Sequence, residues 1–296
     1  MECTLFKRKK NFHTQKELQR RQPVFQVITA IIWLWALTIV FVMAWGLIVS
    51  VSDGIYYSAD PTRFIPRKWR FQNYIDAFAM LEIADTNFWG MVFNSIWFSF
   101  GITSCRIGVT IISAYTVARY KFFGKKALYG FLILQMMVPL YGQTTANYEL
   151  LAGLQLIDSP LIWISWGAGH GMYFLILHSF FVGLDSGYEE AGRLDGASEF
   201  TICFKLMLPL STPVIVAMFI TFWTGAWSDY MTPLLYLPSY PTLSAGLFRY
   251  RLVASYTLDI PIYFAGIFIG SVPPAVIFTI FSDTIMTNMT IGGLKG

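Results

Sequence analysis

The sequence predicts an all-α, polytopic membrane protein with six transmembrane helices. The 296 residues are 55% hydrophobic and 18% aromatic but only 13% charged, and the mean hydropathy of the chain is positive. Soluble domains carry roughly a quarter charged residues, so this composition indicates a chain that is solvated mainly by lipid. The apolar residues gather in runs long enough to span a bilayer, and most basic residues lie between alternate runs.

The N-terminal part predicts a cytoplasmic tail and one span. Residues 1–23 carry seven Lys and Arg against two Glu. The next run, Gln22 to Ser52, has no charge and exceeds a signal-peptide core, so we expect a retained span near Val24 to Val51. A nucleic-acid-binding arm is the alternative for the basic tail. Its position beside a span favours membrane topology instead, and no nucleic acid partner is expected.

Residues 24–84 contain this first span and an outer loop. Within the loop, Phe71 to Ile75 predicts a short helix at the outer surface, where aromatic residues are enriched. Residues 85–286 predict a core of five further spans. These are expected near Phe88–Val117, Ala127–Ala146, Leu161–Val182, Val214–Leu237 and Pro261–Phe281.

Two features subdivide this core. The third span of the chain should be broken or kinked at Pro139 and Gly142, because proline removes a helical hydrogen bond that neighbouring groups must replace. Residues 240–260 are expected to form an outer loop, and residues 287–296 a cytoplasmic tail. With six spans, fourteen of the 21 Lys and Arg lie on the side of the termini and six on the other side. Because basic loops are retained inside, both termini are predicted to be cytoplasmic.

Between the fourth and fifth spans lies a polar segment, residues 185–208, which we call the polar island. Ser186 is followed three residues later by Glu189, a spacing that predicts a capping box at the start of a helix. Gly196 predicts the end of that helix. Ser198 is a preferred first residue for a second short helix, which should end before the fifth span. The island is therefore predicted to fold as helix, glycine turn and helix.

The first helix of the island carries a small apolar face. Tyr188, Ala191 and Leu194 recur every three residues and form a knob suited to a groove in a partner protein. The alternative is a helix that rests on the inner leaflet. Five carboxylates against two basic side chains make an anionic membrane surface a poor partner, so a groove with a basic rim is expected.

The island also resembles a segment of a known family. Importer-type ABC transporter permeases have a cytoplasmic loop with the pattern Glu-Ala-Ala, three residues, Gly, nine residues, Ile, one residue, Leu-Pro. The island has similar residues at these spacings: Glu190, Ala191, Gly192, Gly196, Leu206, Leu208 and Pro209. It departs from the pattern at two positions, where Gly192 replaces Ala and Leu206 replaces Ile.

Further matches extend the resemblance from about Asn94 to the last residue. They are Asn94-Ser95, Ala114-Tyr115 with Ala118-Arg119, and the terminal segment from Thr290 to Gly296. The phrase Glu-Glu-Ala-x-x-x-Asp-Gly-Ala resembles the carbohydrate-uptake, MalG-like branch of these binding-protein-dependent permeases. The chain is similar to that branch over about two thirds of its length.

The resemblance implies a MetI/MalG-like ABC permease core in the bacterial plasma (inner) membrane, a non-catalytic subunit of an ATP-driven importer of a carbohydrate. The implied partners are a homologous second permease, two ABC ATPase subunits, an extracytoplasmic solute-binding protein, the carbohydrate and membrane lipid. ATP and Mg belong to the ATPase, so no cofactor is expected here. The chain also lacks the phosphate-binding pattern Gly-x-x-x-x-Gly-Lys-Ser/Thr.

The resemblance also assigns a role to the island, in which closure of the ATPase dimer rocks the spans between inward-open and outward-open states. The residues expected to couple this chain to the ATPase are Glu189, Glu190, Ala191, Gly192, Asp195, Gly196, Leu208 and Pro209.

Arg106, a charge inside the second predicted span, is a candidate for the substrate path. It lies thirteen residues before Arg119, roughly 20 Å along a helix and too far to reach the inner surface easily. A charge at this depth should face a protein interior or a wet cavity. It either favours an anionic cargo, such as an alginate-like acidic oligosaccharide, or pairs with a carboxylate or carbonyl of a neighbouring helix. Both alternatives are open.

Trp227, Asp229 and Tyr230 form a second candidate for the path, in the outer half of the fifth predicted span. Aromatic faces and a carboxylate hold sugars through CH contacts and hydrogen bonds. Interfacial anchoring explains the aromatic residues equally well.

An ion-coupled secondary transporter is the alternative function. Such proteins place chains of Asp, Glu or His in mid-membrane and show inverted repeats, neither of which is visible in this sequence. A membrane enzyme is a third class, but no catalytic or metal-ligating set emerges.

Overall fold

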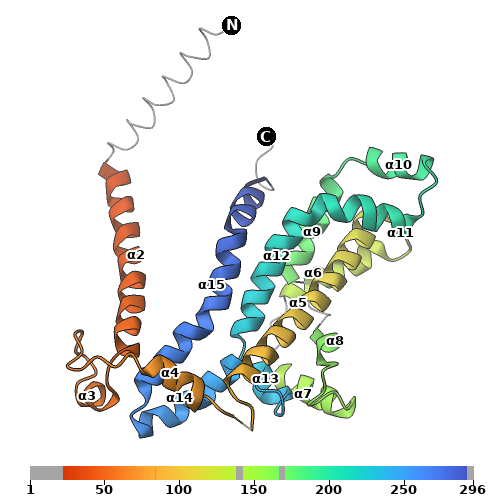
Figure 1. The fold of residues 1–296 in the computed structure, drawn as a ribbon. Helices are drawn as coiled ribbons and strands as arrows, with labels where there is room; N and C mark the ends of the chain where they lie inside the picture. Colours follow the sequence, from red (N-terminus) through yellow and green to blue (C-terminus); the bar gives the residue numbers. More distant parts are fainter. Residues whose placement is uncertain (1–22, 84, 138–142, 167–170, 292–296) are drawn as a thin grey trace.

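Three long helices lie side by side at the centre of the structure (Figure 1): α5 (Phe88–Arg119), α12 (Leu208–Ser228) and α15 (Ile260–Ile291). The computed structural model describes residues 23–83, 85–137, 143–166 and 171–291. α5 packs against α12 and against α9 (Gly171–Gly183), and α12 packs against α15. Apart from two isolated bridges, helices are the only regular secondary structure within these four ranges, which confirms the predicted all-α class.

Four helices in the described ranges are long and apolar enough to cross a membrane. They cover Phe25–Ser50, Phe88–Arg119, Glu199–Ser228 and Ile260–Ser282. These four correspond to the first, second, fifth and sixth predicted spans. α15 continues beyond the predicted end of the sixth span, as far as Ile291.

The packing face of α5 is built from small hydroxyl residues. Ser95, Ser99, Thr103 and Thr110 are all buried and recur at helical spacing. The hydroxyls of Ser95 and Thr110 donate to carbonyls of their own helix, at 2.9 and 2.7 Å. Small side chains that satisfy their hydroxyls locally allow helices to approach closely in lipid, so this face explains why α5 can contact both α9 and α12.

α2 (Pro23–Ser50) forms the first predicted span and stands apart from the other long helices along most of its length (Figure 1). Its last two turns join it to the rest, and the Trp45 ring meets Phe264 of α15 edge to face, with centroids 5.7 Å apart. Asn73 Nδ2, at the start of α4 (Asn73–Met80), donates to the carbonyls of Ser50 and Ser52 at 2.9 and 2.8 Å. α4 confirms the short helix predicted around residues 71–75. A further short helix, α3 (Gly54–Ala59), precedes it.

The third and fourth predicted spans consist of shorter helices. Ala127–Ala146 corresponds to α6 (Lys125–Met137) and part of α7 (Gln143–Gly153), and the predicted break at Pro139 and Gly142 lies outside the described residues. Leu161–Val182 corresponds to α8 (Ile162–Trp166) and α9. The 13 residues of α9 rise roughly 20 Å, less than the ~30 Å hydrocarbon core. Residues 167–170, which join α8 to α9, lie outside the described residues, so the fourth span stays a prediction.

The fifth predicted span begins earlier and ends earlier than expected. α11 (Glu199–Thr201) continues through a π-helical turn, η1 (Ile202–Met207), directly into α12. The π turn ends at Met207 and α12 begins at Leu208, so Pro209 lies in the first turn of α12, where its missing N–H costs no helical bond. The π turn carries the chain into that position, with Leu208 N donating to the carbonyl of Cys203. α12 ends at Ser228.

The outer connection between α12 and α15 is helical, so the loop predicted at residues 240–260 is wrong. It contains α13 (Met231–Tyr236) and α14 (Leu243–Thr257). Two bonds fix the start of α14 on α5: Asn94 Nδ2 donates to the carbonyl of Pro241 at 3.0 Å, and Leu243 N donates to Ser95 Oγ at 2.8 Å. The Asn94-Ser95 pair of the sequence pattern therefore anchors this outer helix.

Candidate functional site

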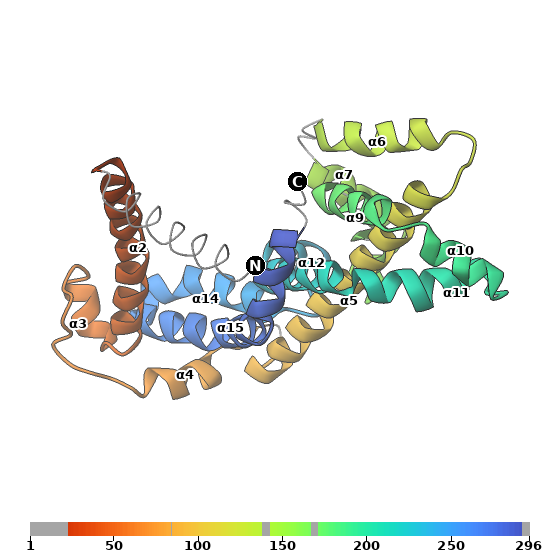
Figure 2. The same ribbon diagram turned by 90° about the horizontal axis from the view of Figure 1, so that it is seen from above.

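The polar island lies at the end of the molecule to which the Pro23 end of α2 and the Ile291 end of α15 also point (Figure 1). It contains α10 (Gly187–Leu194), a turn, α11 and η1. Figure 2 shows the short helices α10 and α11 projecting to one side, beside α5 and away from α15. The helices α3, α13 and α14 lie at the opposite end of the molecule (Figure 1).

A buried apolar cluster holds the base of the island. Ile202 and Met207 of η1 are fully buried and pack in one cluster with Phe181 of α9 and Tyr115 of α5. The rings of Tyr115 and Phe181 meet edge to face, with centroids 5.4 Å apart. The second half of the island is thus part of the helical core rather than a surface loop.

The turn between the two helices of the island is fixed by the glycine that the sequence predicts. Gly196 has φ +75°, a left-handed conformation that other side chains adopt at a cost. Its N–H donates to the carbonyl of Arg193 at 3.1 Å, and Ala197 N donates to the carbonyl of Gly192 at 2.9 Å. Ser198 Oγ then accepts from Thr201 N at 3.2 Å, which confirms the predicted cap of the second helix.

The predicted capping box at Ser186 is wrong. Ser186 itself has helical dihedral angles (φ −65°, ψ −21°), and its side chain makes no capping hydrogen bond. Asp185 Oδ1 instead accepts from Gly187 N at 2.9 Å. Glu189 does not reach back to the start of the helix, because it faces the core and meets a partner from α5.

That partner is Arg119, the last residue of α5. Arg119 Nε and Glu189 Oε1 are 3.3 Å apart, and the two side chains are 12% and 7% exposed. The contact is an ion pair without hydrogen-bond geometry, while Arg119 Nη2 donates to the carbonyl of Leu184 at 2.7 Å. A buried charge that loses its partner costs several kcal/mol, so the pair fixes α10 against α5.

A second link joins the two halves of the island near the surface. Glu199 accepts from Arg193 Nε at 2.8 Å and from the Tyr120 hydroxyl at 2.9 Å. Burial and the neighbouring Glu199 carboxylate raise the pKa of Tyr120 above its usual value, so the phenol stays protonated and can donate. Arg193 and Glu199 are both exposed, and such a pair stabilises a fold by at most about 1 kcal/mol.

Gly192 is buried against the second half of the island. A Cβ added there would lie 3.1 Å from both Ile202 Cγ1 and Leu206 Cδ1. Gly192 and Leu206 are the two positions at which the island departs from the Glu-Ala-Ala pattern. Their contact explains the departures as a pair, because the smaller residue at one position makes room for the side chain at the other. Gly192 therefore serves packing within this chain.

The exposed face of α10 agrees with the predicted knob. Tyr188 is 50% and Leu194 88% exposed, and Ala191 is also exposed. Two further rings, which sequence periodicity did not single out, extend this apolar surface: Phe200 and Phe204 stack with centroids 5.1 Å apart. Glu190 is exposed, unlike its neighbour Glu189.

Arg106 on α5 lies where α5 meets α12 and α9. Its guanidinium carbon is 5.0 Å from the ring centroid of Phe222 on α12, and that ring contacts Tyr173 of α9. Within the described residues Arg106 Nε is buried and has no hydrogen-bond partner. A cation over an aromatic face is favourable when desolvated, so a ring, rather than a carboxylate, is the neighbour found here.

Trp227, Asp229 and Tyr230 have separate surroundings. Trp227 is buried, and its Nε1 donates to the carbonyl of Gly270 at 3.0 Å. Asp229 follows the last residue of α12, and its Oδ1 accepts from the backbone N–H groups of residues 231 and 232, so it shapes the turn into α13. Tyr230 is exposed and stacks on Phe248 of α14.

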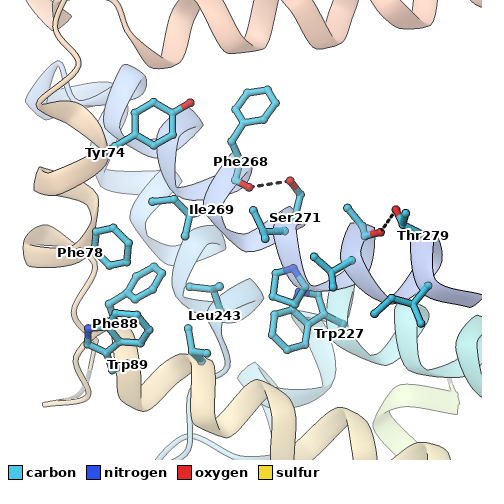
Figure 3. Close-up of a pocket in the computed structure, with 16 residues that line it drawn as sticks. Tyr74, Phe78, Phe88, Trp89, Trp227, Leu243, Phe268, Ile269, Ser271 and Thr279 are labelled. Carbon is cyan, nitrogen blue, oxygen red and sulfur yellow. Dashed lines mark hydrogen bonds between the residues drawn. The ribbon is translucent and has the colours of Figure 1, made fainter.

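Trp227 and Tyr230, but not Asp229, line a hollow of about 420 Å³ among α12, α14 and α15, which we call the outer pocket. It adjoins a larger cavity of about 890 Å³ that is walled mainly by aromatic and aliphatic side chains of α4, α5, α12 and α15 (Figure 3). In the larger cavity the hydroxyls of Ser271 and Thr279 donate to carbonyls of their own helix (Figure 3). That cavity suits an apolar neighbour better than a sugar.

The chain is similar to permease proteins of known transport systems. It is 30% identical over 269 residues to the galactooligosaccharides transport system permease protein GanQ of Bacillus subtilis, covering 88% of this chain and 92% of that protein. It is 26% identical over 233 residues to the arabinooligosaccharides transport system permease protein AraQ of Halalkalibacterium halodurans, covering 79% and 82%.

The fold is similar to a chain of a bacterial ABC transporter involved in the import of the acidic polysaccharide alginate. The TM-score is 0.69 at 19% sequence identity, and the match covers 88% of this chain and 96% of that chain. Residues 106–289, more than half of the sequence, match the family described as binding-protein-dependent transport system inner membrane component. The chain belongs to this family, whose members are the non-catalytic permease subunits of ABC importers.

Proposed function

We propose that this chain is the permease subunit of an ATP-driven importer that moves a carbohydrate, delivered by a solute-binding protein, across the bacterial inner membrane. The chain would pair with a homologous permease above two ATPase subunits. Support comes from the island, which presents an exposed apolar face on a helix that a buried ion pair holds rigidly to α5. The names of the relatives support an oligosaccharide cargo.

The proposed topology has six crossings with both termini in the cytoplasm. The four long apolar helices supply four crossings. The shorter helices α6 to α9 would supply the other two, in a region where neighbouring subunits shield the ends of the helices. The island, the Pro23 end of α2 and the Ile291 end of α15 share one end of the molecule, which supports a common cytoplasmic side.

Force would enter through α10. An ATPase groove that receives Tyr188 and Leu194 would move α10, and two rigid connections would pass this movement to the spans. One is the Arg119–Glu189 pair, which leads to α5. The other is the unbroken path through α11 and η1, which leads to α12. The family pattern implies further coupling residues in and beside the polar island. They would either contact the ATPase or hold the island in shape, and they include Glu190, Asp195, Leu208 and Pro209.

The cargo would pass near Arg106 and the segment from Trp227 to Tyr230. Arg106 supports an acidic oligosaccharide, because its buried Nε is free to bind an anionic group. The Phe222 ring lies beside it as a sugar-compatible surface. On this proposal Asp229 shapes the outer end of the path through the turn that it caps.

The coupling surface can be tested with two variants matched in exposure. Leu194 on α10 and Tyr256 on α14 are each 88% exposed, at opposite ends of the molecule. We expect Leu194→Asp to reduce co-purification of the ATPase and substrate-stimulated ATP hydrolysis in the reconstituted complex, because a charge opposes burial in the groove. Tyr256→Asp should leave both unchanged. Equal retention of ATPase by the two variants would show that α10 is not the docking surface.

A further inference from the structure

The outer pocket adds further aromatic rings to the Trp227–Tyr230 segment of the proposed path. Besides Trp227, three rings line it, from Tyr230 after α12, Phe248 on α14 and Tyr263 on α15. Tyr230 and Phe248 stack with centroids 4.4 Å apart and planes 14° apart. Because Tyr230 is exposed, a flat surface remains available to a second ring-shaped group.

A cation completes this pocket. Arg251 on α14 lines the hollow and is exposed, and within the described residues it makes no ion pair or hydrogen bond. An arginine fork binds a carboxylate through two parallel hydrogen bonds, a geometry that lysine cannot supply. Arg249, two residues earlier on the same helix and also exposed, does not line the pocket.

Hydroxyl oxygens supply the remaining polar groups. Ser228 Oγ donates to the carbonyl of Thr224, and Ser244 Oγ donates to the carbonyl of Trp227. Both serines line the pocket. Since their protons are committed to backbone carbonyls, the serine oxygens are left as acceptors for the hydroxyls of a ligand.

An exposed ring, a free guanidinium and hydroxyl acceptors fit a ligand that has a flat CH face, a carboxylate and several hydroxyls. A pocket of about 420 Å³ lies within the size range of small-ligand sites. We propose that the outer pocket is a subsite for a uronic acid unit of the cargo, with Arg251 binding the carboxylate and Tyr230 stacking on the sugar ring. The site rests on the proposed function, because it presupposes a carbohydrate cargo.

Binding can be measured on the full chain alone, in nanodiscs of neutral phosphatidylcholine, with trigalacturonate and maltotriose as probes. We expect trigalacturonate to bind more tightly than maltotriose. Arg251→Gln should weaken trigalacturonate about tenfold, the value expected for a partly exposed charge-assisted hydrogen bond pair, and leave maltotriose unchanged. Arg249→Gln is the matched control and should behave as the natural chain does.

Several outcomes would overturn the subsite. They are equal affinity for the two trisaccharides, equal weakening by both arginine variants, and no effect of Arg251→Gln. A fourth would come from a second set of nanodiscs that contain phosphatidylglycerol: if Arg251→Gln weakens binding of this lipid but not of trigalacturonate, the arginine belongs to a lipid-headgroup site. Maltotriose binding without a preference for the uronate removes the subsite but keeps the carbohydrate cargo. If neither sugar binds, the cargo itself is contradicted, whereas the ATPase docking test is independent of all these results.

Discussion

Gly192 and Leu206 offer a sharp test of how the island is packed. In Gly192→Ala the new methyl group would lie 3.1 Å from Ile202 Cγ1 and from Leu206 Cδ1, where an ordinary carbon contact is about 3.5–4.0 Å. Overpacking of this kind costs roughly 1–3 kcal/mol, and replacing glycine inside a helix recovers about 1 kcal/mol. The variant should therefore lose about 1 kcal/mol of unfolding free energy.

A double-mutant cycle separates this contact from other effects. Leu206→Ile moves the branch of the side chain towards the backbone, so Gly192→Ala should cost less in that background. We expect a coupling free energy of about 1 kcal/mol, measured by titrating the full chain in mixed micelles with denaturing detergent. Additivity of the two substitutions within ~0.3 kcal/mol would refute the argument that they share one space.

Three further predictions concern single positions. Glu189→Gln should cost about 2–3 kcal/mol, because it leaves the buried Arg119 guanidinium without its counter-charge, and thermal unfolding of the chain in nanodiscs would measure this. Gly196→Val should cost roughly 1–2 kcal/mol through its left-handed backbone and raise hydrogen exchange in α10. Burial raises the pKa of Asp53, but hydrogen bonding and the charge of Lys68 lower this pKa to below its usual value. The ionised Asp53 therefore stabilises the fold at neutral pH, and this stabilisation is lost as the pH falls through the lowered pKa. Lys68→Met should move the loss of stability to higher pH, and hydrogen exchange of the α3 amides should then increase at a higher pH than in the natural chain.

Each of these has a control within the chain. Glu190→Gln changes the exposed neighbour of Glu189 and should leave thermal stability within ~0.5 kcal/mol of the natural chain. Gly196→Asn should be tolerated better than valine, because asparagine adopts left-handed angles more readily. A Lys68→Arg variant keeps the charge and should keep the acid response of α3. Equal effects of a variant and its control would contradict the corresponding explanation.

Local motifs of the island could be predicted from the sequence because they depend on neighbouring residues alone. A glycine that ends a helix and a serine that begins the next were both found in the structure. The capping box failed for the opposite reason. The local pattern paired Glu189 with the start of its own helix at Ser186. In the fold Glu189 pairs instead with Arg119, seventy positions earlier, because α5 and α10 pack together.

Hydropathy located the four long helices, because their apolar runs are continuous. The π turn before Pro209 has no signature in an apolar pattern, so the sequence did not show that the second helix of the island runs directly into α12. The outer pocket was missed for a related reason. Arg251 falls in the segment that the sequence predicted as a loop, and only the fold of α14 brings it into one pocket with Tyr230.

The uninterrupted path from Glu199 to Ser228 makes this part of the chain a lever. Its 30 residues extend roughly 45 Å, so a tilt of a few degrees at the polar island displaces the far tip by several ångströms. That tip adjoins the outer pocket. Opening of the outer pocket and docking of a partner on the polar island would then both follow from one rigid-body rotation. No chain of small side-chain movements would be required between the two sites.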